Sequence, residues 1–168
     1  MTVFEDGQYS EWLYKYVRDN IYVISSLKND GVAITRNCLL LSASDDYDYI
    51  MFLDSDDMID CDFIRKMYEM AGTNEYDMII SKFIMNKKEI IYNKRSNVAG
   101  ICLRTEFIKG LSFNVEYNIS EDALFIEEVY KRNPRIGKID SNYYYNYGAN
   151  PNSLMMRFER SELNLMKE

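Results

Sequence analysis

No histidine occurs among the 168 residues of this chain. Within the chain, this absence excludes imidazole as a general base, the Ser-His-Asp and Cys-His nucleophile systems, and every metal site with a histidine ligand. Proton transfer in any reaction catalysed by these residues must therefore use carboxylates, lysine, tyrosine or cysteine.

Cysteine is also scarce, with Cys38, Cys61 and Cys102 as the three examples. An odd number of widely spaced cysteines, each among apolar neighbours, is typical of reduced core thiols rather than of a disulfide framework. No CxxC spacing indicates zinc. The thiols favour a reducing compartment.

Long apolar runs are missing as well. The longest, such as "YIMFL", are far shorter than the ~20 residues that a membrane span requires. Glu5 and Asp6 interrupt the N-terminus where the apolar part of a signal peptide would lie. We therefore expect a cytoplasmic protein with no transmembrane segment.

Positive charge is in the minority. The formal net charge is -7 and the sequence pI is about 4.8, which argues against nucleic acid as a partner. An anionic substrate would need a metal ion or a few well-placed Arg and Lys side chains. The length and the 47% of hydrophobic residues suit one domain with a real core.

Extended and helical patterns alternate along the chain, which predicts an α/β fold. Strands are expected at 1–5, 21–27 and 47–54, a meander at 76–86 and 89–93, and an extended segment followed by a loop at 135–154. Helices are expected from Ser10, at 32–44 and 61–71, and at 120–133 with Ser120 as N-cap.

The stretch "YIMFLDSDDMID", residues 49–60, gathers four carboxylates after an apolar run. The run predicts a central strand covered on both faces, and ligands bind beyond the carboxyl ends of strands in open α/β sheets. Asp54 and Asp56 can point toward the same place. Paired carboxylates suit Mg²⁺ or Mn²⁺, which take other ligands from water and substrate phosphates.

The acidic stretch also has other interpretations. Asp56, Asp57 and Asp60 could form a solvated loop and helix N-terminus, where negative charge is stabilised, and we expect this role for Asp57 and Asp60. An EF-hand is excluded, because the pattern needs Gly at Ile59 and Glu at Arg65. A phosphohydrolase of the DxD type would have Thr or Val in place of Met58.

Four ordered motifs together resemble family 2 glycosyltransferases. The stretch "NDGVAITRNCLLLSASDDYDYIMFLDSDDMIDCDFI" is similar to the donor-binding half of that family, and "YNISEDALFIEEVY" to its ED motif at a helix start. The segment "YYYNYGANPNSL" resembles its C-terminal Y-x-Y…N-S pattern, and "VFEDGQ" its D-D-G-S turn, with Glu5 in place of the first Asp. DxD alone is a weak signal, whereas the ordered set is much stronger.

The resemblance implies a GT-A-like fold and inverting transfer from a nucleotide sugar, most often a UDP sugar, with Mn²⁺ or Mg²⁺. The acceptor could be a saccharide, a lipid-linked glycan or a protein. The implied roles are nucleobase contact for Asp6, base or ribose contact for Arg36, ribose, metal and diphosphate binding for Asp54 and Asp56, and catalysis for Glu121 and Asp122, with Asp122 as the base.

Each role has a plainer alternative. Glu121 and Asp122 could simply stabilise the first turn of a helix. Arg36 could form an ordinary surface ion pair, and Asp6 could be a turn residue. The tyrosines of residues 143–147 are expected in the core or on a sheet face.

The resemblance also implies an N-terminal truncation, because family members begin with an extra strand and helix, about 30 residues for such a unit. The expected fold is then a doubly wound mixed sheet flanked by helices, with a gap between the strand ending at Glu5 and the one ending at Asp54. An unpaired edge invites association, so a homodimer is possible. The alternative function is a catalytically degenerate domain that binds nucleotide or protein.

The chain is expected to form one domain over residues 1–168. Residues 1–60 would make its donor- and metal-binding half, 61–155 its acceptor-binding and catalytic half, and 156–168 a C-terminal tail.

Overall fold

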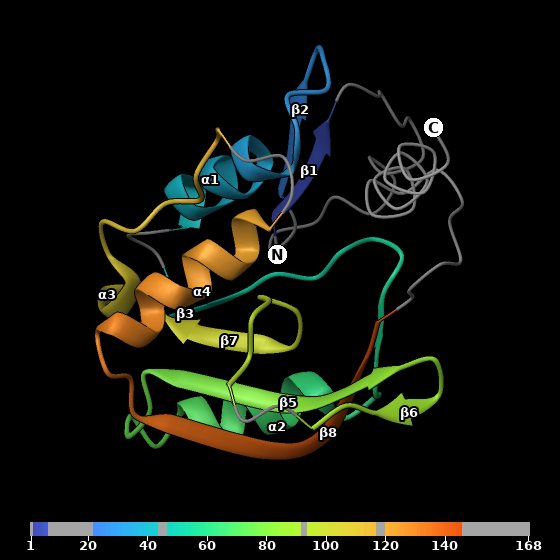
Figure 1. Ribbon diagram of the computed structural model, residues 1–168, viewed down its shortest axis with the longest axis vertical. Coiled ribbons are helices and arrows are strands. Elements are labelled where there is room, and N and C mark those ends of the chain that lie inside the picture. Colours follow the sequence, from blue (N-terminus) through green and yellow to red (C-terminus); the bar gives the residue numbers. More distant parts are fainter. Residues whose placement is uncertain (1, 7–21, 44–46, 92–93, 117–119, 146–168) are drawn as a thin grey trace, which may run out of the picture.

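The computed structural model of the chain describes residues 2–6, 22–43, 47–91, 94–116 and 120–145 (Figure 1). Its elements in chain order are β1 (Thr2–Asp6), β2 (Tyr22–Ser26), α1 (Val32–Ala43), β3 (Tyr49–Met51), β4 (Met58–Ile59), α2 (Phe63–Ala71), β5 (Met78–Met85), β6 (Lys88–Glu89), β7 (Ile101–Arg104), α3 (Thr105–Ile108), α4 (Glu121–Lys131) and β8 (Ile136–Tyr145). The expected α/β alternation is confirmed. The helix expected from Ser10 lies outside the described residues.

The described strands form two sheets. β1 and β2 pair in parallel as a two-stranded sheet. The larger, mixed sheet has the order β3-β7-β5-β8-β4, with β6 paired to β5. Within it, β5 and β8 are parallel, and the other pairs are antiparallel. Among the described residues, no strand pairing joins β1 or β2 to β3, so the strand ending at Asp6 and the one leading to Asp54 are separate, as the sequence predicted.

The prediction of a central third strand was wrong. β3 has three residues, lies at one end of the larger sheet and pairs with β7 alone among the described strands. β7 is buried on both faces, since Leu103 is 1% exposed on one face and Cys102 is 8% exposed on the other. The apolar run misled because Phe52, directly after β3, is buried in the core rather than hydrogen-bonded in the sheet.

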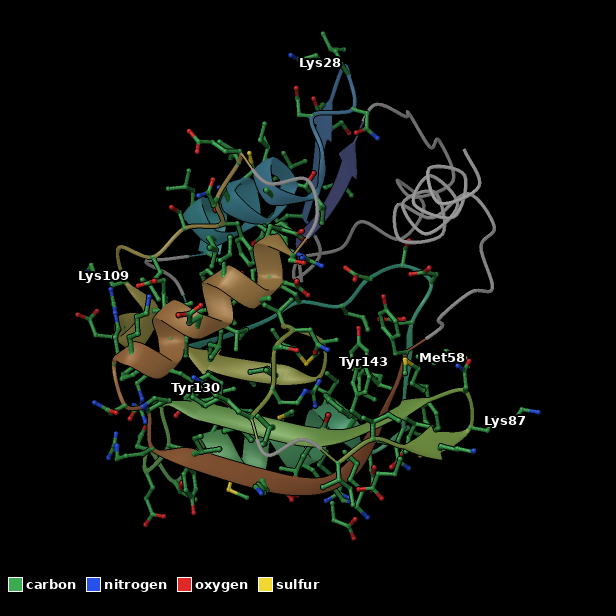
Figure 2. All side chains as sticks on the ribbon, viewed as in Figure 1. Lys28, Met58, Lys87, Lys109, Tyr130 and Tyr143 are labelled. Carbon is green, nitrogen blue, oxygen red and sulfur yellow. The ribbon has the colours of Figure 1, made fainter. Side chains whose placement is uncertain are left out.

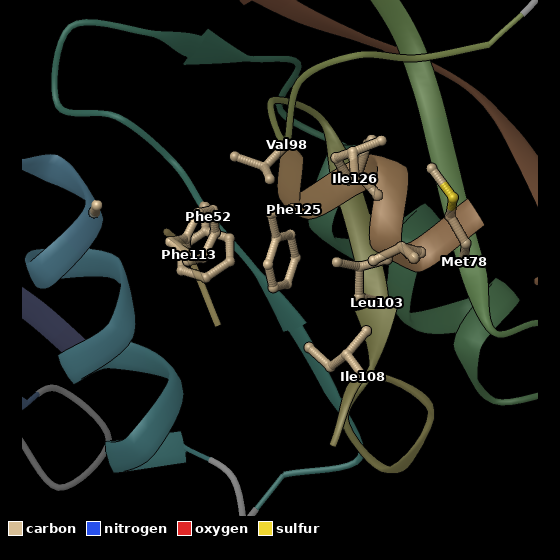
Figure 3. Close-up of a cluster of buried hydrophobic side chains, with 11 residues drawn as sticks. Phe52, Met78, Val98, Leu103, Ile108, Phe113, Phe125 and Ile126 are labelled. Carbon is tan, nitrogen blue, oxygen red and sulfur yellow. The ribbon is translucent and has the colours of Figure 1, made fainter. Parts of the chain in front are cut away.

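Helices cover both faces of the larger sheet, because successive strand residues point to opposite sides. Met78 and Leu103 pack with Phe125 and Ile126 of α4 on one face (Figure 3). Ile79 and its neighbours pack on the other face against α2. That second cluster of buried residues comprises Phe63, Met67, Ile79, Phe83, Ala99, Cys102, Ile139 and Tyr143.

Side chains sort between surface and interior as expected for such layers. Lys28, Lys87 and Lys109 point outward, whereas Tyr143 lies inside (Figure 2). The buried thiol of Cys102 agrees with the sequence prediction, and its burial raises its pKa to about 12. Cys61 corrects that prediction, because it is exposed at the turn into α2.

Residues with positive φ angles occur in the turn after β5 and directly before α4. Asn86 and Lys87 both have positive φ angles, 52° and 63°, as a tight hairpin between β5 and β6 requires. This hairpin confirms the first turn of the expected meander, but β6 is Lys88–Glu89 rather than the expected 89–93, and residues 92–93 lie outside the described ranges. Ser120 precedes α4 as predicted, but its φ of 68° is left-handed and its side chain makes no capping hydrogen bond. The capping role of Ser120 is therefore corrected.

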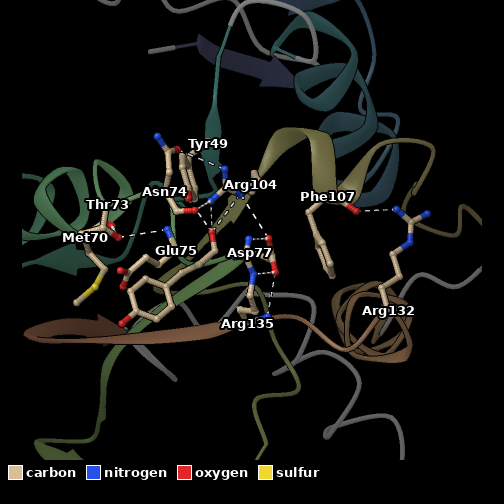
Figure 4. Close-up of polar contacts among 11 residues, drawn as sticks. Tyr49, Met70, Thr73, Asn74, Glu75, Asp77, Arg104, Phe107, Arg132 and Arg135 are labelled. Carbon is tan, nitrogen blue, oxygen red and sulfur yellow. Dashed lines mark hydrogen bonds and ion pairs between the residues drawn. The ribbon is translucent and has the colours of Figure 1, made fainter.

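A polar network connects β5, β7 and β8 near Tyr49, the first residue of β3 (Figure 4). Asp77, directly before β5, accepts hydrogen bonds from the Arg135 guanidinium at 2.8 and 2.9 Å and from the Arg135 backbone N–H at 3.0 Å. Arg104, at the end of β7, donates to the carbonyls of Asn74 and Tyr76, both at 2.8 Å. This network fixes the register of β5, β7 and β8.

Candidate active site

Arg36 joins two acidic motifs that are far apart in the sequence. Its Nη1 donates to Oε1 of Glu121 at 2.7 Å, and its Nη2 lies 3.3 Å from both carboxylate oxygens of Asp54. The Arg36 and Glu121 side chains are each 8% exposed, and that of Asp54 is 44% exposed. Arg36 is therefore a buried bridge, which corrects the alternative of an ordinary surface ion pair.

The neighbouring residue, Asn37, fixes the wall beneath this bridge. Its side-chain amide donates to the Phe113 carbonyl at 2.9 Å and accepts from the Phe113 N–H at 2.7 Å. The Phe113 ring stacks on Phe125 with centroids 4.1 Å apart and meets Phe52 edge-on. The Arg36 guanidinium lies 5.6 Å from the Phe113 centroid. Arg36 therefore makes the charged contacts of the site, and Asn37 holds the backbone of Phe113 in place. The role of Asn37 was not predicted from the sequence.

The acidic pair at the start of α4 is electrostatically strained. Burial raises the pKa of Glu121, the charge of Asp122 adds to the increase, and Arg36 opposes it. Burial also raises the pKa of Asp122, against the opposing effect of Arg36. A carboxylate whose pKa is raised binds a proton more readily, which is the property of a general base. The Glu121 carboxylate is bound to Arg36, whereas the Asp122 carboxylate accepts the N–H of Ala123 at 2.8 Å.

The carboxylates after β3 lie on a tight turn. The N–H of Asp57 donates to the Asp54 carbonyl at 3.1 Å, which closes a four-residue turn with Ser55 and Asp56 exposed at its tip. No hydrogen bond or ion pair of Asp56 with another described residue occurs. Its carboxylate is available to a ligand.

The expected solvated role of Asp57 and Asp60 is corrected, because both hold β8. The hydroxyl of Tyr143 donates to Asp57 Oδ2 at 2.5 Å. Asp60 accepts from the Asn142 N–H and from the Tyr144 hydroxyl, each at 2.8 Å. Hydrogen bonds from β8 therefore hold both carboxylates in place.

Tyr145 is a further residue of the site that sequence reasoning did not single out. Burial raises its pKa to about 12, and the negative charges of Asp57, Asp54, Asp122 and Asp56 add to the increase. The raised pKa keeps the Tyr145 phenol neutral near physiological pH. The ring is stacked on Phe83 with centroids 5.5 Å apart.

Of the predicted site residues, the structure brings together Arg36, Asp54, Glu121 and Asp122, with Asp56 on the same turn as Asp54. The backbone of Asp6 ends β1 opposite Ser26, but its side chain lies outside the described part of the chain. In that part, no three His, Cys, Asp or Glu side chains are grouped so as to hold a metal ion. A metal would rely on Asp54 and Asp56 with other ligands from elsewhere.

A cavity of about 440 Å³ lies apart from these carboxylates. It opens between the later turns of α1 and the segment from α3 to residue 112, lined by Leu40, Ile50 and Leu111 among others. No predicted site residue lines it. None of the helices in the described ranges is long and apolar enough to cross a membrane.

A mixed sheet between helices, with an acidic turn after β3 and an acidic pair opening α4, defines a GT-A-like domain. The chain belongs to Glycosyl transferase family 2, whose sequence profile matches residues 6–134. No curated protein matches the chain.

Crystal structures of S. aureus TarS have the same fold. The structure of TarS 1-349 in complex with UDP aligns with a TM-score of 0.73 and 21% identity, over 86% of this chain and 50% of that one. The structure of TarS 1-349 in complex with UDP-GlcNAc aligns with a TM-score of 0.72 and 20% identity, over 86% of this chain and 48% of that one. A further TarS structure aligns with a TM-score of 0.72 and 19% identity, over 85% of this chain and 30% of that one. The chain thus spans half or less of the TarS chains it matches.

Proposed function

We propose that this domain transfers a sugar from a nucleotide-sugar donor to an acceptor hydroxyl. The observation that carries the proposal is the Arg36 bridge, because it brings the acidic turn of residues 54–57 and the acidic pair of α4 to one place. The first motif belongs to the proposed donor half, residues 1–60, and the second to the proposed acceptor half, residues 61–155. TarS, with the same fold, has been crystallised with UDP and UDP-GlcNAc, which supports a UDP sugar as donor.

The proposed metal ligands are Asp54 and Asp56, with Mn²⁺ or Mg²⁺ as the ion. The residues fit such an ion, because these cations bind through one or two carboxylates and take their remaining ligands from water and substrate phosphates. When bound, the ion would neutralise charge on the leaving diphosphate. Arg36 holds Asp54 in place, and Asp6 is the proposed contact to the nucleobase.

Asp122 is the proposed general base. Its carboxylate is partly buried beside the Arg36 guanidinium, and its raised pKa suits removal of a proton from the acceptor hydroxyl. The oxygen then attacks the anomeric carbon as the nucleotide diphosphate leaves, and a single displacement inverts that carbon. Glu121 is instead a positioning residue, because its carboxylate is occupied by Arg36.

The partners and location of the domain are part of the same proposal. The acceptor is a hydroxyl of a saccharide, a lipid-linked glycan or a protein, and the free thiols of the described cysteines favour a cytoplasmic setting. A second copy could pair with the outer edges of β1 or β3, which have no strand partner in the described ranges. The proposed tail, residues 156–168, lies outside those ranges.

One observation favours the second candidate, a degenerate nucleotide-binding domain. Among the described strands, β1, which carries Asp6, does not pair with the larger sheet that leads to Asp54, so the proposed nucleobase and diphosphate contacts lie on separate sheets. The transferase should turn over a nucleotide sugar, whereas the degenerate domain should only bind the nucleotide.

The experiment is release of UDP from UDP-GlcNAc with Mn²⁺, compared between wild type and Asp122→Asn. If the domain transfers the sugar to an acceptor or to water, wild type should release UDP and Asp122→Asn should not. UDP should still bind to both proteins. Binding without release in wild type supports the degenerate domain. Equal release by both proteins would exclude Asp122 as the base.

A further inference from the structure

Tyr143 is a fully buried tyrosine whose hydroxyl contacts the acidic turn. The residue is 0% exposed and lies in β8, opposite Ile59 of β4. Its hydroxyl donates to Oδ2 of Asp57 at 2.5 Å. Figure 2 shows Tyr143 and Met58, which follows the turn, in the same part of the molecule.

Packing fixes the Tyr143 ring on several sides. Phe83 stacks on it with centroids 6.2 Å apart, and Phe63 meets it at 62° with centroids 6.3 Å apart. Gly100 closes another side, because a Cβ there would lie 2.8 Å from the Cβ of Tyr143. The hydroxyl is thus presented from a rigid base.

Asp57 connects the fixed Tyr143 hydroxyl to the turn that carries Asp54 and Asp56. Its side chain accepts the Tyr143 hydroxyl, and its backbone N–H donates to the Asp54 carbonyl at 3.1 Å. One residue thus closes the turn and anchors it to β8. Burial and the hydrogen bond to Asp57 raise the pKa of Tyr143 above its ordinary value, in keeping with a hydroxyl that donates to Asp57.

We propose that Tyr143 is a positioning residue for donor binding, which through Asp57 fixes the turn that carries Asp54 and Asp56. This inference rests on the proposed function, since it assigns the turn to the donor diphosphate. Tyr143 itself touches neither substrate nor metal in this scheme. The hydrogen bonds of Asp60 to Asn142 and Tyr144 do not hold the turn, because they join the chain after β4 to β8.

The test compares Tyr143→Phe with a matched control, Tyr144→Phe. Each variant loses one hydroxyl that donates from β8 to a carboxylate, Asp57 in the first case and Asp60 in the second, and each keeps its aromatic ring. Thermal unfolding establishes that both variants fold. Asp57→Asn is the conservative variant, since it keeps an oxygen that can accept the Tyr143 hydroxyl, and Asp57→Ala removes that oxygen.

The first readout is hydrogen exchange of a peptide that spans residues 54–57, which needs no ligand. We expect faster exchange in Tyr143→Phe and Asp57→Ala than in wild type, and near wild-type exchange in Tyr144→Phe and Asp57→Asn. Unchanged exchange in Tyr143→Phe would overturn the anchoring of the turn.

The second readout is the affinity for UDP in the presence of Mn²⁺. Loss of a hydrogen bond to a charged group corresponds to about a tenfold weaker Kd, which we expect for Tyr143→Phe but not for Tyr144→Phe. Faster exchange with an unchanged Kd would overturn the role in donor binding. If wild type binds no UDP, the proposed function fails, and the donor-binding part of this inference fails with it, while the exchange data still decide whether Tyr143 holds the turn.

Discussion

Arg36 and Glu121 form a buried ion pair with 2.7 Å between Nη1 and Oε1, although they are 85 positions apart in the chain. The pair links the second turn of α1 to the first residue of α4. Because the same guanidinium also reaches Asp54, the two acidic motifs share one positive charge at the centre of the candidate site.

Glu121→Gln should therefore destabilise the fold. Burial raises the pKa of Glu121 as it does that of Asp122, but Gln would also leave the buried Arg36 guanidinium with one carboxylate partner. We expect this loss to exceed the gain from removing a buried charge, with a net decrease of about 1–3 kcal/mol in the free energy of unfolding, measured by urea denaturation. The control is Glu128→Gln, which alters an exposed pair with Lys131, and its loss should be much smaller. Equal losses would contradict a structural role for the Arg36 bridge.

Asp122→Asn should stabilise the protein near neutral pH. Burial raises the folded-state pKa of Asp122 above the ordinary 3.8, so the protonated group stabilises the fold below that ordinary value. This contribution is lost as the pH rises through the raised pKa. Asn cannot ionise, so the gain over wild type should grow from acidic to neutral pH in thermal unfolding. A gain that is the same at every pH would show that the Asp122 charge is not the cause.

Asp77→Asn should have the opposite pH dependence. The hydrogen bond from Arg135 lowers the folded-state pKa of Asp77, so its contribution is present above the ordinary pKa of 3.8 and lost as the pH falls through the lowered one. We expect a loss of about 2 kcal/mol at neutral pH, since hydrogen bonds to a charged group disappear. Urea denaturation should show the difference from wild type shrinking in acid. Asp140→Asn, at an exposed pair with Lys82, is the control with little expected effect.

Gly100→Ala should be much more damaging than Gly110→Ala. Both glycines have positive φ angles, 67° and 78°, so both substitutions carry backbone strain of about 1 kcal/mol. A Cβ on Gly100 would also lie 2.4 Å from Ser81 Oγ and 2.8 Å from Tyr143 Cβ, whereas Gly110 has nothing within 4 Å. We expect a further loss of about 1–3 kcal/mol at Gly100. Similar unfolding midpoints for the two variants would show that Tyr143 has room to move.

Much of the fold could be predicted from local patterns. The helical spacing of Phe63 and Met67 predicted α2, and two extended runs separated by Lys87 and Lys88 predicted the hairpin after β5. β7 was missed because "ICLR" is short and its burial arises from long-range pairing with β3 and β5. The position of β3 at the end of the sheet depends on the same pairing, which an apolar run alone cannot encode.

The candidate site was predicted as a set of residues but not as a geometry. Motif order identified Arg36, Asp54 and Asp122, yet nothing local indicates that Arg36 would be buried between Asp54 and Glu121. The roles of Asp57 and Asp60 could not be foreseen, since their partners lie in β8, more than 80 positions later. Clustered carboxylates look solvated in a sequence when their hydrogen-bond donors come from a distant strand.

The most direct test of the donor site is calorimetric titration of the wild-type chain and of Asp56→Asn with UDP, first with Mn²⁺ and then with EDTA. Asp56 is exposed and unpaired among the described residues, so the variant should keep wild-type stability. The account predicts that wild type binds UDP with Mn²⁺ and loses it in EDTA, and that Asp56→Asn binds at least tenfold more weakly. Equal binding by both proteins in both conditions, or no binding at all, would contradict a metal-dependent donor site at the turn of residues 54–57.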